Sequence, residues 1–111
     1  MEDDILNLFG IAQRSGNLVT GEDTCIFYLR KNKINLVIVT EDASSQTKLK
    51  FQKICEKKKI LFSIYGYRDA LSQAIGRTNR TVYAVKDKMF AEKLLYLIKE
   101  HNSRLNNRGG E

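Results

Sequence analysis

The segment Leu36–Val39 constrains the fold most. It is a run of four apolar residues, three of them β-branched, with no polar residue between them. Such a run predicts a strand buried on both faces, in a sheet that helices cover on each side. The strand is expected to end near Glu41 and Asp42, because two adjacent carboxylates are seldom buried together. Ligands of open α/β sheets gather outside the carboxyl ends of strands, so any site is expected beside these two residues.

Helices and strands are predicted to alternate along the whole chain. Apolar residues at helical spacing predict helices over 3–14, 22–31, 45–58 and 68–75, and a last helix that Asp87 begins. Runs rich in β-branched and aromatic residues predict strands at 18–20, 35–40, 60–65 and 81–85. This order favours an α/β fold in which helices enclose a parallel or mixed four-stranded sheet.

The predicted elements form one domain over residues 1–100, followed by a polar, flexible tail over 101–111. No apolar run approaches the roughly 18 residues that span a bilayer, and the acidic residues after Met1 do not fit a signal peptide. A cytoplasmic protein is therefore expected. It is expected to be a monomer, because no surplus apolar stripe is evident.

The two cysteines are predicted to be buried thiols. Cys25 and Cys55 stand alone within apolar helical patterns, without a CxxC motif. The single histidine, His101, lies near the end of the chain, so a zinc site is not expected. We expect no disulfide, no metal and no cofactor.

The net charge of +6 is unevenly distributed. Residues 1–29 carry five acidic residues against one basic residue, whereas residues 30–61 carry nine basic against three acidic, and residues 62–111 nine against five. This asymmetry indicates a basic face and a polyanionic partner, most simply RNA or DNA. A basic composition that serves solubility alone is the alternative.

The glycines at 16 and 21 have the spacing of a phosphate-binding loop, but the residues after them do not fit. That loop needs Lys and then Ser or Thr after its second glycine. Glu22 and Asp23 occupy those positions here, and their charge would repel a phosphate. A nucleotide triphosphatase is therefore not expected.

Glu41 and Asp42 could form an acid/base pair or half of a magnesium site. No third acid, histidine or nucleophile is tied to them by a motif, so a solvated strand end is the simpler interpretation. An enzyme that uses a divalent metal at this pair remains a minor hypothesis. No catalytic set is predicted.

Two segments fit nucleic acid. The turn at Gly21, Glu22 and Asp23 offers backbone amides and carboxylates at a helix start, and carboxylates can accept hydrogen bonds from base amines. The loop Arg77, Thr78, Asn79 and Arg80 offers two guanidiniums to phosphates and two side chains to base edges. We expect both segments at one end of the sheet, with Lys48 completing the patch.

Three stretches resemble the L7Ae/L30e family of RNA-binding proteins, most closely its small bacterial, YlxQ-like branch. They are GIAQRSGNLVTGEDT at 10–24, NLVIVTEDAS at 35–44 and RDALSQAIGR at 68–77. The resemblance covers about residues 4–99. It implies a three-layer α/β/α sandwich and, in the best-known members, recognition of kink-turn RNA through a Gly-x-Asn-Glu-x-x-Lys motif at the start of the second helix.

That motif is only partly present in this sequence. Its glycine corresponds to Gly21, but its Asn, Glu and Lys positions fall on Asp23, Thr24 and Phe27. The family loop that covers a flipped-out nucleotide corresponds to Arg77–Arg80, which is more basic here. The resemblance thus implies binding to structured, ribosomal or kink-turn-like RNA that is weaker and more salt-dependent than in archaeal members.

The leading hypothesis is accordingly a non-catalytic RNA-binding protein. The alternative is a ribosome-associated assembly factor that contacts another protein through a helix face. An exposed aromatic pair, Phe27 and Tyr28, would favour that alternative.

Overall fold

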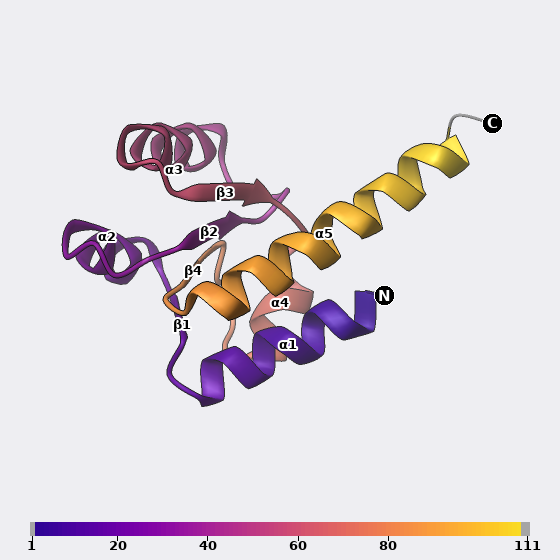
Figure 1. Cartoon of the computed structure of the whole chain (residues 1–111), viewed down its shortest axis with the longest axis horizontal. Coiled ribbons are helices and arrows are strands. Elements are labelled where there is room, and N and C mark those ends of the chain that lie inside the picture. Colours follow the sequence, from indigo (N-terminus) through magenta and orange to yellow (C-terminus); the bar gives the residue numbers. More distant parts are fainter. Residues whose placement is uncertain (1, 110–111) are drawn as a thin grey trace.

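The computed structural model describes the backbone of residues 2–109 and the side chains of residues 2–105. Helices and strands alternate along this part of the chain (Figure 1). The helices are α1 (Glu2–Arg14), α2 (Glu22–Arg30), α3 (Ser45–Lys58), α4 (Arg68–Ala74) and α5 (Lys88–Gly109). The strands are β1 (Leu18–Thr20), β2 (Leu36–Val39), β3 (Leu61–Ile64) and β4 (Val82–Val85). The predicted alternation is confirmed.

The strands form one mixed sheet in the order β1-β4-β2-β3. β2 and β3 are parallel, whereas β4 runs antiparallel to both of its neighbours, β1 and β2. The carboxyl ends of β1, β2 and β3 therefore lie at the same edge of the sheet as the start of β4. Of the two arrangements that the sequence left open, the mixed one is correct.

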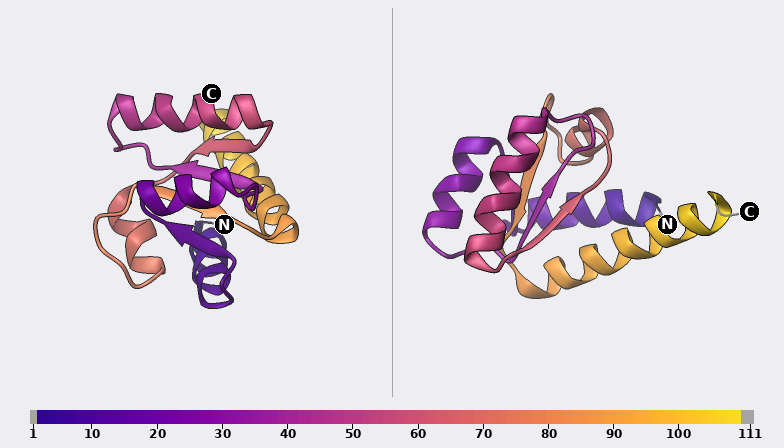
Figure 2. Two further views of the ribbon diagram at one scale, coloured as in Figure 1. Left: turned by 90° about the vertical axis from the view of Figure 1, so that its left-hand side faces the viewer. Right: turned by 90° about the horizontal axis from the view of Figure 1, so that it is seen from above.

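The side chains of β2 and β4 alternate between two cores, as expected of strands buried on both faces. Leu36 and Ile38 of β2 face a core that also holds Tyr83 of β4 and buried residues of α1, α4 and α5. Val37 and Val39 face a second core with buried residues of α2 and α3. Figures 1 and 2 show these helices on the two sides of the sheet. The structure is thus the α/β/α sandwich that the resemblance implied.

Most helix ends follow the signals in the sequence. The Ser44 hydroxyl accepts a hydrogen bond from the Thr47 amide at the start of α3, and the Asp87 carboxylate accepts one from the Phe90 amide at the start of α5. Gly16 is left-handed just after α1, with a φ of 78°. These caps explain why the helix starts could be predicted within one or two residues.

The last helix is longer than predicted. α5 continues to Gly109, whereas the sequence predicted a domain that ends at residue 100 and a polar, flexible tail from residue 101. The polar residues of this segment include no proline, and the two consecutive glycines stand only at its end, so nothing interrupts the helix earlier. His101 also packs edge-on against Tyr65, with ring centroids 5.8 Å apart. Whether this last part of the helix is flexible stays a prediction.

Helix α1 packs closely on α4 at Gly10. A Cβ atom at this position would lie 3.1 Å from the carbonyl oxygen of Ala74. The glycine within α1 therefore has the packing role that offsets its low helix propensity. Among residues 2–109, no helix has the length and apolar character that crossing a membrane requires.

Candidate nucleic-acid interface

The turn at Gly21 and the loop Arg77–Arg80 lie at the same edge of the sheet, as predicted. Thr20, the last residue of β1, is opposite Tyr83 of β4. The Gly21 amide donates a hydrogen bond to the Val82 carbonyl over 3.1 Å, and the Thr20 hydroxyl donates to the same oxygen over 2.8 Å. These bonds fix the start of α2 beside the start of β4.

The first turn of α2 has backbone amides without a side-chain cap. Gly21 is the N-cap residue and has no side chain to cap the helix, and the first intrahelical bond runs from the Cys25 amide to the Gly21 carbonyl. The amides of Glu22, Asp23 and Thr24 thus precede the first intrahelical donor, at the positive end of the helix dipole. The side chains of these three residues are exposed.

The guanidinium of Arg80 lies over this helix start. A Cβ atom at Gly21 would be 3.2 Å from Nη1 of Arg80. The Nε atom of Arg80 is buried, and no acceptor among the described residues is within hydrogen-bonding distance of it. A buried guanidinium N–H without an acceptor is costly, and the charge of the same guanidinium favours an anion nearby.

A hollow of about 300 Å³ lies beside Arg80. Residues of α1, β1 and α2 line it together with the basic loop: Gln13, Leu18, Val19, Thr20, Thr24, Arg77 and Arg80. No carboxylate is among these residues, whereas two guanidiniums are. The hollow is therefore electropositive and suits a phosphate or the polar edge of a base.

The buried side chains of Ser72 and Tyr83 hold the backbone of Arg80 in place through hydrogen bonds. The Arg80 amide donates to Ser72 Oγ over 2.8 Å, and the Tyr83 hydroxyl donates to the Arg80 carbonyl over 2.9 Å. The two hydroxyls are 3.1 Å apart and hydrogen-bonded to each other. Burial raises the pKa of the Tyr83 phenol, although the Ser72 hydroxyl and the Arg80 charge act in the opposite direction. The phenol therefore stays protonated and available as a donor.

Arg68 links the loop Arg77–Arg80 to the segment that follows β2 through two side-chain hydrogen bonds. Nη1 of Arg68 donates to Oδ1 of Asn79 over 3.0 Å, and its Nε donates to a carboxylate oxygen of Asp42 over 3.2 Å. Asp42 also accepts a hydrogen bond from the Arg68 amide over 3.1 Å, which caps α4 from a distant loop. Asn79 has a left-handed backbone, with a φ of 55°, that this contact helps to hold.

The Asp42 carboxylate has a structural role. Desolvation opposes its ionisation, but the neighbouring Thr40 side chain and the hydrogen bonds and charge of Arg68 hold its pKa below the usual value. Asp42 is exposed, as expected of a solvated strand end, and it also has Arg68 as a hydrogen-bonded partner. Among the described residues, no group of three His, Cys, Asp or Glu side chains could hold a metal ion.

Lys48 is near this edge but has a different partner. Its ammonium donates a hydrogen bond to the Glu41 carbonyl. The preceding residue, Thr47, donates to the Glu22 carboxylate over 3.4 Å, and Lys50 lies 3.7 Å from the other oxygen of Glu22. The first turns of α2 and α3 are thus adjacent, and Lys48 supports the β2–α3 connection. The Arg77 and Thr78 side chains, by contrast, are exposed.

A model described as the ribosomal protein L7Ae/L30e/S12e/Gadd45 family matches residues 3–95. The chain belongs to this family. It is 40% identical over 91 residues to a Bacillus subtilis protein named RNA-binding protein YlxQ, a match that covers 82% of this chain and 91% of the relative. An Enterococcus faecium protein of the same name is 35% identical over 94 residues, which cover 84% of this chain and 89% of the relative.

Two solved structures share the fold of this L7Ae-family chain. A Bacillus halodurans protein of unknown function is 37% identical and has a TM-score of 0.82, with 86% of this chain and 96% of that chain covered. The Giardia lamblia 15.5kD RNA binding protein has a TM-score of 0.74 at 18% identity, with 89% and 88% covered. At that identity the second likeness concerns the fold alone.

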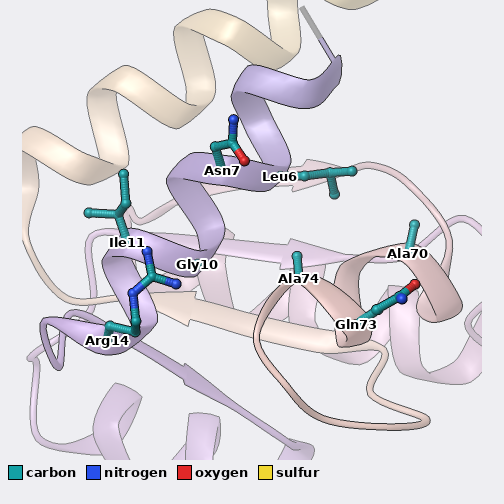
Figure 3. A pocket seen from close by; sticks show the side chains of 8 residues that line it. All are labelled: Leu6, Asn7, Gly10, Ile11, Arg14, Ala70, Gln73 and Ala74. Atoms are coloured by element: carbon teal, nitrogen blue, oxygen red, sulfur yellow. The ribbon is translucent and has the colours of Figure 1, made fainter.

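Two other features of this family member are not part of the interface. An open hollow of about 500 Å³ lies between α1 and α4 beside their contact at Gly10, and its lining also contains Ala70 and Ala74, with Arg14 as its single charged residue (Figure 3). The cysteines are buried and free, as predicted. Burial raises the pKa of Cys25 to about 12, with smaller effects of Cys55 and Glu22, and burial raises the pKa of Cys55 to about 11.

Sequence reasoning missed the residues that hold the basic loop: Arg68, Ser72 and Tyr83. One signal for Arg68 was available. A cation in the first turn of a helix is unfavourable next to the dipole, which suggests that a carboxylate lies nearby. Ser72 and Tyr83 have no such signal, because a serine in a helix and a tyrosine in a strand are ordinary.

Proposed function

We propose that this protein binds structured RNA without catalysing a reaction, through the start of α2 and the loop Arg77–Arg80. The observation that carries the proposal is the position of Arg80, whose guanidinium lies over Gly21 beside uncapped helix amides. The Arg80 guanidinium can bind a phosphate, and the adjacent helix amides, which Glu22 and Asp23 flank, can donate to base or sugar oxygens. The names of the Bacillus subtilis and Enterococcus faecium relatives support RNA as the partner.

Each side chain of the interface has a role that fits its chemistry. Arg77 and Arg80 contact phosphates, and Asp23 accepts hydrogen bonds from base amines or imino groups exposed in a non-canonical pair. Thr24 and Asn79 can each donate to a base edge or a sugar hydroxyl. Because the family's Asn, Glu and Lys positions hold Asp23, Thr24 and Phe27, phosphate contacts contribute more of the affinity than in kink-turn binders that keep them.

The experiment is a binding titration of purified protein with a kink-turn RNA and a matched straight duplex over a salt series. Phosphate-dominated binding predicts a steep loss of affinity as salt rises. A preference for the kink-turn would indicate that Asp23 and the basic loop replace the missing motif residues. Equal, salt-sensitive binding would indicate a general RNA surface. A flat salt response would contradict the phosphate-dominated model.

Arg77→Ala and Arg80→Ala locate the interface in the same assay. Each is expected to weaken RNA binding and to lower the salt slope by about one, because each removes one phosphate contact. Lys99→Ala is the matched control, since it removes one exposed positive charge from α5, on the other side of the sheet. If both arginine variants bind like wild type, the proposed interface is wrong.

A further inference from the structure

Phe27 is exposed on the helix that begins the interface. Its side chain is 52% exposed, although phenylalanine is usually buried. It follows Asp23 by four residues and Thr24 by three, so all three lie on one face of α2 within about one turn. The ring is therefore next to the amides and side chains of the proposed RNA interface.

The Phe27 ring belongs to a short series of aromatic and basic side chains. It meets Tyr28 edge to face, with centroids 5.2 Å apart and planes at 89°. The Lys31 ammonium lies 5.0 Å from the Phe27 centroid, and the Lys86 ammonium lies 4.2 Å from the Tyr28 centroid. Aromatic rings beside cations are the usual composition of surfaces on which unpaired bases stack.

We propose that Phe27 is a stacking platform for an unpaired base of the bound RNA. This inference rests on the proposed function and specifies one of its contacts. The base would displace the Lys31 ammonium from the face of the ring. The family's Lys position thus carries an apolar contact here, while the charge lies one turn later on the helix.

A base fits this surface better than a protein partner does. The other exposed large hydrophobic residues among those described lie on other elements, such as Leu49 on α3 and Tyr96 on α5. Phe27 is therefore the one large hydrophobic side chain of α2 that is exposed, and it has the Lys31 ammonium over its ring. One base can cover one ring, and every base has a face that can stack.

The affinity of Phe27→Leu is compared with that of wild type, first for the kink-turn RNA. It is then compared for a series of copies of this RNA, each of which lacks the base of one unpaired nucleotide. On the intact RNA we expect a loss of affinity of about tenfold with an unchanged salt slope, because stacking involves no phosphate. On the RNA that lacks the stacked base, Phe27→Leu and wild type should bind equally. Tyr96→Leu is the control, because Tyr96 is 62% exposed on the opposite side of the sheet.

Phe27→Trp gives a direct signal, because the chain contains no other tryptophan. Its fluorescence should be quenched when the kink-turn RNA is added, and quenching should be lost with the abasic RNA that abolishes the Phe27→Leu effect. Tyr96→Trp should keep its fluorescence with either RNA. Thermal unfolding of each variant checks that the fold is unchanged.

The outcomes separate this proposal from the proposed function. If Arg80→Ala weakens binding while Phe27→Leu binds like wild type, the RNA interface stands and the platform is wrong, which would leave Phe27 as a contact for a protein. A Phe27→Leu defect that persists on every abasic RNA would also overturn the stacking contact. If wild type binds neither RNA, both proposals fail.

Discussion

Arg80 and Gly21 lie side by side although they are 59 positions apart in the sequence: a Cβ atom on Gly21 would lie 3.2 Å from Nη1 of Arg80. Gly21 also has a φ of 96° and a ψ of 145°, a conformation that is essentially confined to glycine. The residue is thus required for backbone conformation and for space. This contact joins the start of α2 to the basic loop.

Gly21→Ala is expected to lose stability and RNA affinity together. The strained backbone should lower the free energy of unfolding by about 1–3 kcal/mol, and the new methyl group should displace the Arg80 guanidinium. Gly16→Ala is the matched control, because Gly16 also has a positive φ, 78°, but has open space around its Cβ position. Urea denaturation and RNA titration of both variants check this, and equal RNA affinities would contradict the role given to the contact.

Asp42→Ala is expected to destabilise the fold and loosen the loop. It removes the cap of α4 and the partner of Arg68, each a partly exposed interaction, for a combined loss of about 1–2 kcal/mol. Asp42→Asn, which keeps an acceptor, should lose less. Urea denaturation at neutral pH measures the difference, and Glu41→Gln, at the exposed neighbouring carboxylate, is the control that should change little.

The low pKa of Asp42 also predicts a pH dependence. Because its folded-state pKa lies below the unfolded value of about 4, the contribution of Asp42 is fully present above that value and is lost as pH falls through the folded-state pKa. Wild type and Asp42→Asn should therefore converge in stability at strongly acidic pH. A constant difference across the acidic range would show that the charge of Asp42 is unimportant.

The two thiols are expected to be unreactive in the folded protein. With a pKa of about 12 for Cys25 and about 11 for Cys55, almost no thiolate exists at pH 8, and both side chains are buried. A thiol reagent such as DTNB should label neither at pH 8 in buffer and both in urea. Because both pKa values are raised, folding stability should fall as pH rises above about 9. Rapid labelling of one thiol in buffer would show that its helix opens.

The sequence was sufficient for the layers of the fold but not for the details of the interface. The unbroken apolar run Leu36–Val39 predicts a strand covered on both faces, and caps such as Ser44 and Asp87 locate the helix starts. Local patterns do not predict the order of the strands in the sheet, because the central position of β4 depends on contacts between distant segments. The resemblance implied the three layers but gave no strand order, so the order β1-β4-β2-β3 comes from the structure alone.

Within the candidate site, the glycine and the arginines of the interface could be predicted from the sequence. The residues that hold them in place, Arg68, Ser72 and Tyr83, could not. Gly21, Arg77 and Arg80 are conspicuous because a glycine before a helix and a basic loop have few structural explanations. Asp42 and Arg68 are hydrogen-bonded but lie 26 positions apart, so a local sequence pattern could not pair them. Lys48 is one of several lysines in α3, so the pattern could not single out its contact with the Glu41 carbonyl either.

Ser72→Ala and Tyr83→Phe test whether the backbone of the basic loop must be fixed. Ser72→Ala leaves the Arg80 amide without its acceptor in a partly buried place, which should lower the free energy of unfolding by about 1–3 kcal/mol. Tyr83→Phe should cost less, about 1 kcal/mol, because the Ser72 hydroxyl, 3.3 Å from the Arg80 carbonyl, can still donate to it. The losses should not add in the double variant, since the two hydroxyls share one network.

RNA titration of the folded variants then decides the function of the network: Ser72→Ala should weaken binding more than Tyr83→Phe, because it releases the backbone that positions the Arg80 guanidinium. Wild-type affinity in a destabilised Ser72→Ala protein would mean that the network serves folding alone.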